Sequence, residues 1–194
     1  MSKLADSPSR EATAGIEFVE SDRFEEQVLA AARRVEQGVP HVLLVVKLDH
    51  ATVVSQECGE EAEAALFDVL RHALDQQIGC GACASRLRAD HIAILHPGCL
   101  PRDALALGKR VRTALENGQF VWKGLSFRLG ASVGVLELDG ASVRPSDQVA
   151  RAARASETAA ALGGDGVVVD AGTPEDRLAQ DRERGWREHL QEII

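Results

Sequence analysis

Residues 41–48 read His-Val-Leu-Leu-Val-Val-Lys-Leu, an apolar run with one charge near its end. The run is short for a helix, and three of its residues are β-branched valines, which favour strands. A strand that is apolar at almost every position has both of its faces covered. We therefore predict that residues 41–48 form the central strand of a sheet buried between helices, as in an α/β protein.

Helical patterns flank this strand on both sides. Before it, apolar residues recur on one helical face from Ser21, a good N-cap, until Gly38 and Pro40 end the pattern. After it, residues 57–76 carry apolar residues at helical spacing and glutamates that would face solvent. The sequence predicts an amphipathic helix on each side of the strand.

Two hairpins follow. The first has strands on either side of residues 88–90 and ends at Pro97 and Gly98, and the second joins residues 119–122 to residues 125–138. We also predict helices at residues 101–116 and 145–161 and a last strand at residues 167–169. Together these elements indicate an α/β fold with a central, mainly antiparallel mixed sheet flanked by helices.

The two ends of the chain differ from this core. Residues 1–19 are polar and lack the apolar segment of a secretory signal, so we expect a flexible N-terminal tail. Residues 20–170 form one domain, as expected for a chain of 194 residues. Residues 171–194 predict a charged connector helix with a narrow apolar stripe. Because this pattern reaches Ile194 without a stop signal, we expect the chain to have been excised from a longer protein.

The composition excludes several classes of protein. The chain has 22 Lys and Arg against 30 Asp and Glu, and this net charge of -8 argues against broad binding to nucleic acid or to an anionic membrane. No apolar run approaches the roughly 20 residues of a transmembrane helix. We expect a cytoplasmic protein that binds no nucleic acid and inserts no part of this segment into a membrane.

Cys80 and Cys83 have the spacing of a redox pair or of half a zinc site. The other cysteines, Cys58 and Cys99, have no second cysteine or histidine at finger-like spacing, as a structural zinc site would need. If Cys83 opens a strand, the side chains of Cys80 and Cys83 do not share a face. Packing in a reducing compartment is therefore favoured over redox or metal chemistry.

The order of these elements resembles the GGDEF domain of diguanylate cyclases, which join two GTP molecules into cyclic di-GMP. The resemblance spans roughly residues 20–170 and is carried by short matches in the family's order: Phe24-Glu25-Glu26, Leu48-Asp49-His50, Gly59, Arg86-Leu87, Ile92 to Gly98, Ala131 to Val135, and Gly163. It implies a fold like that of the nucleotide cyclases, and magnesium and GTP as ligands of an active member.

The chain departs from the family at the signature itself. The five signature positions are Arg88, Ala89, Asp90, His91 and Ile92. The family's two glycines let the backbone turn tightly and approach the nucleotide, and Arg88 and Ala89 remove that freedom. His91 replaces the second acidic residue, and we interpret it as a polar hairpin residue rather than as a general base.

The resemblance also implies metal ions held by two carboxylates, one at the third signature position and one at the end of the central strand. Asp90 preserves the first, but Lys47 stands in place of the second. An ammonium group offers no ligand to magnesium and repels it. We expect Lys47 to form an ion pair with Asp90 or Asp49 in the place of the metal, or otherwise to extend toward solvent.

Other nucleotide contacts that the resemblance implies are replaced too. The family's guanine-reading, phosphate-contacting and product-binding positions carry other residues here: Ser55 and Ala64, Ala160 and Gly164, and Gly79 and Ala82. An alanine at position 64 accepts no hydrogen bond from a base. The resemblance thus implies a nucleotide site that is degenerate at several independent positions.

These departures lead to one main hypothesis and two alternatives. The main hypothesis is a catalytically inactive GGDEF domain, without cofactor, that acts as a regulatory or dimerisation module in bacterial cyclic di-GMP signalling. Its expected partners are a downstream EAL-type phosphodiesterase or other signalling domain, reached through residues 171–194, and a second copy in a homodimer. The alternatives are a weakly active diguanylate cyclase that uses Asp90 and Asp49 with GTP and magnesium, and a receptor that binds GTP without turnover.

Overall fold

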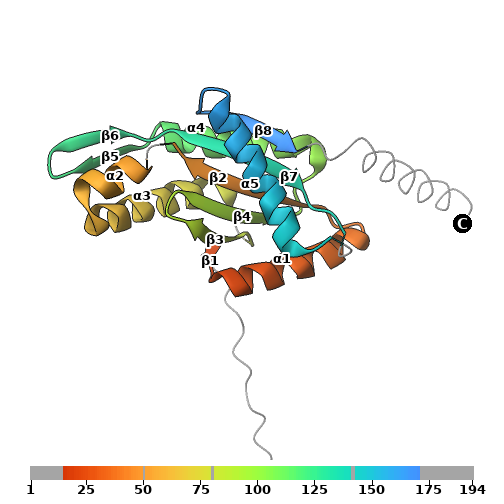
Figure 1. Ribbon diagram of the computed structural model, residues 1–194. Coiled ribbons are helices and arrows are strands. Elements are labelled where there is room, and N and C mark those ends of the chain that lie inside the picture. The colour runs from red at the N-terminus through yellow and green to blue at the C-terminus, as the bar shows by residue number, and fades with distance from the viewer. Residues whose placement is uncertain (1–14, 50, 80, 141–142, 171–194) are drawn as a thin grey trace, which may run out of the picture.

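The computed structural model describes residues 15–49, 51–79, 81–140 and 143–170 of the chain. Figure 1 shows how its helices and strands are arranged. In chain order, the elements are β1 (Glu17–Phe18), α1 (Ser21–Glu36), β2 (His41–Leu48), α2 (Ala51–Cys58), α3 (Glu60–Ile78), β3 (Cys83–Arg88), β4 (His91–Pro97), α4 (Pro101–Glu116), β5 (Gln119–Trp122), β6 (Leu125–Arg128), β7 (Ala131–Glu137), α5 (Pro145–Ala161) and β8 (Val167–Asp170).

The central sheet has six strands in the order β1-β3-β4-β2-β7-β8. Strand β2 lies inside it and pairs antiparallel with both β4 and β7, whereas β1 and β8 pair parallel with their neighbours β3 and β7. Residues 42–46 of β2 are fully buried. The predictions of a buried central strand and of a mainly antiparallel mixed sheet are therefore confirmed.

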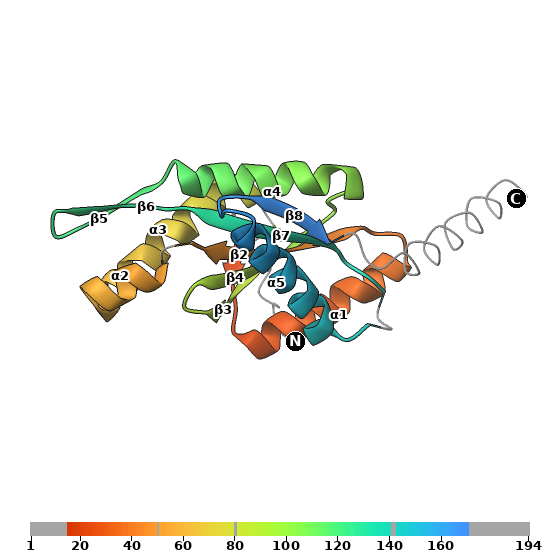
Figure 2. The ribbon, with the colours of Figure 1, turned by 45° about the horizontal axis from the view of Figure 1, so that its top comes forward.

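Helices cover both faces of this sheet, as Figures 1 and 2 show from two directions. Leu44 and Val46 of β2 pack with buried residues of α3 and α4. The alternate residues of the strand, Leu43 and Val45, pack with buried residues of α1 and α5. Because successive side chains of a strand point to opposite faces, β2 contributes apolar side chains to the hydrophobic cores on both faces of the sheet. The predicted α/β sandwich is confirmed.

Two expectations about element boundaries were wrong. The single helix predicted at residues 57–76 is two helices, α2 and α3, which are separated by Gly59 at a φ of 82°. Residues 125–138 do not form one strand, because β6 pairs only with β5 in a separate sheet and β7 pairs with β2. Between them, Leu129 is buried in the core and the Gly130 carbonyl accepts a hydrogen bond from Asp49 N–H. These tertiary contacts divide an otherwise continuous pattern.

The start of the domain also differs from the expectation. Glu17 and Phe18 lie within the segment predicted as a flexible tail, yet they form β1 at the edge of the central sheet. Ser21 is the first residue of α1 rather than its N-cap, a position that Glu20 takes without a side-chain cap. The helices predicted at residues 101–116 and 145–161 are confirmed.

Parts of the chain that carry predictions lie outside the described residues, namely residues 1–14, His50, Cys80 and the connector helix predicted at residues 171–194. Across the described ranges, no helix combines the length and the apolar character that a bilayer crossing requires.

Candidate functional site

Three polar side chains stand side by side on the face of the sheet that α5 covers. Lys47 in β2 is paired with His91 in β4 on one side and with Ser132 in β7 on the other. Lys47 follows Val45 by two residues, so its side chain leaves the same face as the valine and points toward α5. The strand register thus brings together residues that are up to 85 positions apart in the sequence.

Lys47 forms an ion pair with Glu157 of α5, in which Lys47 Nζ lies 2.5 Å from Glu157 Oε2. The expected pairing with Asp90 or Asp49 was therefore wrong. The α5 helix crosses the sheet directly above Lys47, whereas Asp49 lies past the end of the strand and Asp90 is engaged by another residue. The hydrogen bond from Lys47 holds the pKa of Glu157 below its ordinary value.

His91 is the next member of this cluster, and its side chain is only 3% exposed. Its Nδ1 lies 2.7 Å from Asp90 Oδ1, and its Nε2 lies 3.1 Å from Glu157 Oε1 but without the alignment of a hydrogen bond. Burial alone would raise the pKa of Asp90, but the interactions with His91, a backbone hydrogen bond and the charge of Lys47 together outweigh burial and lower that pKa. His91 is thus a residue of the β3–β4 hairpin, as interpreted, but it is buried between two carboxylates, which the sequence did not indicate.

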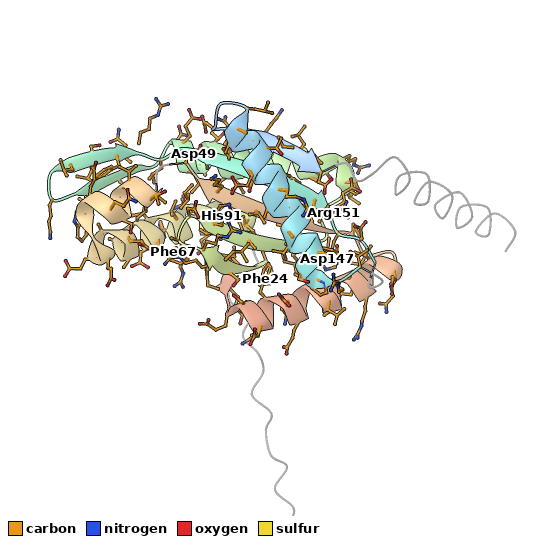
Figure 3. All side chains as sticks on the ribbon, in the orientation of Figure 1. Phe24, Asp49, Phe67, His91, Asp147 and Arg151 are labelled. Carbon is orange, nitrogen blue, oxygen red and sulfur yellow. The ribbon has the colours of Figure 1, made fainter. Side chains whose placement is uncertain are left out.

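Asp49 ties three segments together at the end of β2. Its Oδ1 accepts a hydrogen bond from Ser132 Oγ at 2.8 Å, and its Oδ2 accepts one from the backbone N–H of Asp165 at 2.9 Å. The carboxylate therefore joins the start of β7 to the loop that connects α5 with β8. Figure 3 labels Asp49 at the end of the sheet away from α1.

A cleft of about 510 Å³ opens beside these residues and is lined by Lys47, Asp49, Ala160, Gly164 and their neighbours. Three acidic and two basic residues line the cleft. One of the basic residues, Arg128, forms an ion pair with Glu116, with 3.2 Å between Nη2 and Oε1. Lys47 is paired with Glu157, as described above. Ala160 and Gly164 add no charge to the cleft. Both basic side chains of the lining, Lys47 and Arg128, are therefore already paired with carboxylates.

The remaining signature positions occupy different environments. Arg88 is exposed and borders a second hollow of about 220 Å³, which also touches His91 and lies between α1 and α5. Ala89 and Asp90 form the turn of the β3–β4 hairpin. Ile92 is 1% exposed and belongs to the hydrophobic core. The hairpin predicted around residues 88–90 is confirmed.

The residues that correspond to base-reading and product-binding positions do not join this cleft. Ser55 lies on α2, where it hydrogen-bonds Glu63, and Ala64 is exposed on α3. Gly79 ends α3 and Ala82 is buried beside β3. The structure thus brings Lys47, Asp49, Ala160 and Gly164 to one cleft and leaves Ser55, Ala64, Gly79 and Ala82 outside it.

The donor set does not suit a divalent metal ion. The Asp90 carboxylate is engaged by His91, and Lys47 and Glu157 neutralise each other where a second carboxylate would be needed. Among the described residues, no three or more His, Cys, Asp or Glu side chains are grouped so that they could hold a metal. Cys83 is buried, and burial raises the pKa of its thiol to about 11, which opposes redox reactivity of this cysteine.

Sequence reasoning missed Glu157, which makes the contacts that define this cluster. Glu157 sits in a helix rich in alanine and polar residues, and nothing in that pattern distinguishes it from a solvent-facing glutamate. Ser132 gave a weak signal, because it lies in the matched run Ala131 to Val135. The partners of Lys47 depend on where α5 crosses the sheet, and only the fold reveals this.

Comparisons with known proteins agree with this architecture. The family model described as "Diguanylate cyclase, GGDEF domain" matches residues 20–166. A probable diguanylate cyclase of Escherichia coli K12, DgcE, is 26% identical over 152 residues, which are 76% of this chain but only 14% of the relative. The chain therefore spans a small part of that protein's length.

Solved structures show the same fold. The GGDEF domain of FimX from Pseudomonas aeruginosa is 25% identical, with a TM-score of 0.71 over 79% of this chain and 94% of that one. The GGDEF domain of DgcB from Caulobacter crescentus, solved in complex with c-di-GMP, has a TM-score of 0.72 at 14% identity and covers 88% of this chain and 100% of that one. The chain belongs to the GGDEF family and is a GGDEF domain of the diguanylate cyclase type.

Proposed function

We propose that this chain is a catalytically inactive GGDEF domain that serves as a regulatory or dimerisation module in cyclic di-GMP signalling in the cytoplasm. The observation that carries the proposal is the ion pair between Lys47 and Glu157 at the end of the central strand. Active GGDEF diguanylate cyclases use GTP and Mg²⁺. Two-metal phosphoryl transfer requires carboxylates that bridge cations to the phosphates, and an ammonium group cannot replace one.

Two further features support the loss of catalysis. His91 occupies one oxygen of the Asp90 carboxylate, so fewer lone pairs of this group are available to a metal ion. In the alternative, a rearranged site of Asp90 and Asp49, each oxygen of Asp49 already accepts one hydrogen bond, and these bonds direct the carboxylate toward Ser132 and the Asp165 backbone. A cation at this place would have to share these oxygens with the existing hydrogen bonds.

A turnover assay tests this proposal directly. The purified chain is incubated with GTP and Mg²⁺ or Mn²⁺, and the products are separated by chromatography, with an active GGDEF domain as the positive control. We expect no cyclic di-GMP above the level of the Asp90→Asn variant. Product that forms in the wild type and disappears in Asp90→Asn would instead establish a weakly active cyclase.

GTP binding without turnover is a second candidate, favoured by one observation. The cleft beside Lys47 has a volume of about 510 Å³ and remains open despite the substitutions around it. Titration calorimetry with GTP, with and without Mg²⁺, tests this function. We expect heat that depends on Lys47 if the cleft binds the nucleotide, and no heat if regulation acts through surfaces alone.

The regulatory role requires partners. SiaD of Pseudomonas aeruginosa, a diguanylate cyclase with a TM-score of 0.71 to this chain, was solved in complex with its activator SiaC. For this chain we propose a downstream EAL-type or other signalling domain reached through residues 171–194, and a second copy in a homodimer. In the full-length protein, Trp186→Ala should alter the activity of the downstream domain, and sedimentation of the isolated chain measures dimerisation. Unchanged downstream activity would contradict the connector role.

A further inference from the structure

Three backbone N–H groups in and beside the short strand β1 donate hydrogen bonds to the rest of the domain. Glu17 N–H donates to the Ala82 carbonyl at 3.1 Å, and Val19 N–H donates to the Ala84 carbonyl at 2.8 Å. One residue earlier, Ile16 N–H donates to Asp75 Oδ1 of α3 at 2.6 Å. The segment from Ile16 to Val19 is therefore held against both the sheet edge and α3. Figure 1 shows β1 beside β3, whose far end leads into the signature turn.

The side chain of Phe18 continues this attachment toward α3. Its ring meets the ring of Phe67 edge to face, with centroids 5.4 Å apart and planes at 74°. Such aromatic pairs are favourable because the positive edge of one ring meets the negative face of the other. The guanidinium carbon of Arg86 in turn lies 5.2 Å from the centroid of Phe67. Phe67, labelled in Figure 3, therefore contacts both β1 and β3.

Arg86 connects this contact to the signature turn. Its Nε donates to the Arg88 carbonyl at 3.2 Å, and its Nη2 donates to the Ala89 carbonyl at 3.3 Å. The same guanidinium forms an ion pair with Glu63 of α3. The pairing of β3 with β4 shifts register between Arg86 and Arg88, and such a bulge frees backbone carbonyls from the strand ladder. Just beyond this irregularity, Arg86 provides donors for the carbonyls of Arg88 and Ala89.

We propose that β1 controls the conformation of the signature turn through the chain of contacts Phe18–Phe67–Arg86, with Arg86 as the positioning residue. Movement of β1 away from β3 releases one side of Phe67, which loosens the stacking that orients the guanidinium of Arg86. The turn then loses donors at Arg88 and Ala89, next to the carboxylate that holds His91. The sheet edge at β1 is thus a place where a regulatory signal can act on the signature turn. This role does not depend on whether the domain converts GTP.

Hydrogen exchange measured by NMR on the intact chain tests this coupling. Phe18→Leu removes the aromatic contact, and Phe127→Leu, which changes a partly buried ring on β6, is the matched control. We expect the amides of residues 89–91 to exchange about two- to fivefold faster in Phe18→Leu, the scale of one exposed contact between an aromatic ring and a cation. We expect the same amides to keep their wild-type rates in Phe127→Leu.

A double variant distinguishes coupling from general loosening. Arg86→Lys keeps a positive charge but lacks the planar group that stacks on Phe67 and reaches two carbonyls. In the Arg86→Lys background, Phe18→Leu should produce no additional change at residues 89–91. Additive changes, or wild-type exchange of the turn in Phe18→Leu, would overturn the proposal. If Phe18→Leu does not fold, Asp75→Asn weakens the anchor of Ile16 without touching the rings, and it must accelerate exchange of the same amides.

Discussion

The two hairpins of this domain have equally short turns but are held in different ways. At the tip of β5–β6, Lys123 and Gly124 both have positive φ values, 47° and 88°, as a turn matched to the twist of the strands requires. At the tip of β3–β4, Ala89 and Asp90 have no positive φ, and a register shift precedes the turn. Arg86 holds the carbonyls there instead. The first turn depends on its own backbone, and the second on contacts from the rest of the fold.

This difference explains why the signature can lack glycine. A side chain is compatible with the backbone at Arg88 and Ala89, the two positions where the family has glycine, because neither residue has a left-handed conformation. Replacing glycine at these two positions therefore leaves the hairpin itself in place. The signature hairpin persists as a structural element with other residues at its glycine positions.

The largest effect is expected in a third region, where α5 packs directly on the backbone of β7. A Cβ added at Gly134 would lie 2.0 Å from the Ala152 carbonyl oxygen and 2.5 Å from Ser156 N, both backbone atoms of α5. Gly134→Ala should therefore lower the free energy of unfolding by at least about 3 kcal/mol, measured by urea denaturation. Gly166→Ala is the matched control, because the nearest atom to its added Cβ is 3.7 Å away, and it should be near neutral. Equal losses of stability in the two variants would show that α5 does not restrict the space beside Gly134 of β7.

The next effect concerns the residue that holds the β3–β4 turn. Arg86→Ala removes two hydrogen bonds to carbonyls and the contact with Phe67, and we expect a loss of about 1–2 kcal/mol in urea denaturation. Arg128→Ala on β6 is the control, because the pair with Glu116 involves an arginine side chain that is 81% exposed. An exposed pair of this kind contributes about 0–1 kcal/mol. A smaller loss for Arg86 than for Arg128 would contradict the comparison of the two hairpins.

Smaller changes in stability are expected when the glycine of one hairpin turn and the alanine of the other are each replaced by the other residue type. Gly124→Ala places a Cβ at a positive φ and should cost about 1–2 kcal/mol. Ala89→Gly should also destabilise the fold, by about 0.5–1 kcal/mol, because glycine gains freedom in the unfolded chain without relieving any strain. Thermal or urea unfolding measures both. A stabilised Ala89→Gly variant would show that Ala89 is strained, against the negative φ that it adopts.

The smallest effect is expected from acid. The folded-state pKa of Glu157 is lowered by Lys47, so its contribution to stability is present above the ordinary pKa of a glutamate and is lost as the pH falls through the lowered value. The loss is limited because the side chain is 45% exposed and solvent screens the pair. Between pH 6 and about pH 3, Glu157→Gln should therefore lose slightly less stability than the wild type. Parallel curves for the two proteins would argue against this ion pair.

Much of the fold could be predicted from local pattern, and the misses share one cause. The apolar run of β2 and the strand-ending Pro97 and Gly98 at the end of β4 indicated the sheet because burial and chain-breaking residues act over a few residues. The boundary between β6 and β7 was missed because burial of Leu129 and the hydrogen bond from Asp49 divide a sequence that looks continuous. Strand β1 was missed because a strand of two residues is too short to show an alternating pattern of apolar and polar residues. Tertiary contacts decide such elements.

The candidate site shows the same division. The sequence by itself indicated the family, the residues at the signature positions and the cation at Lys47, because residue identities at fixed spacing carry that information. It did not determine that Glu157 is the partner of Lys47, that His91 is buried between carboxylates, or that Arg86 supports the turn. Those contacts depend on strand register and on where helices cross the sheet. Such distances follow from the packing of the whole chain, and only the tertiary structure decided them.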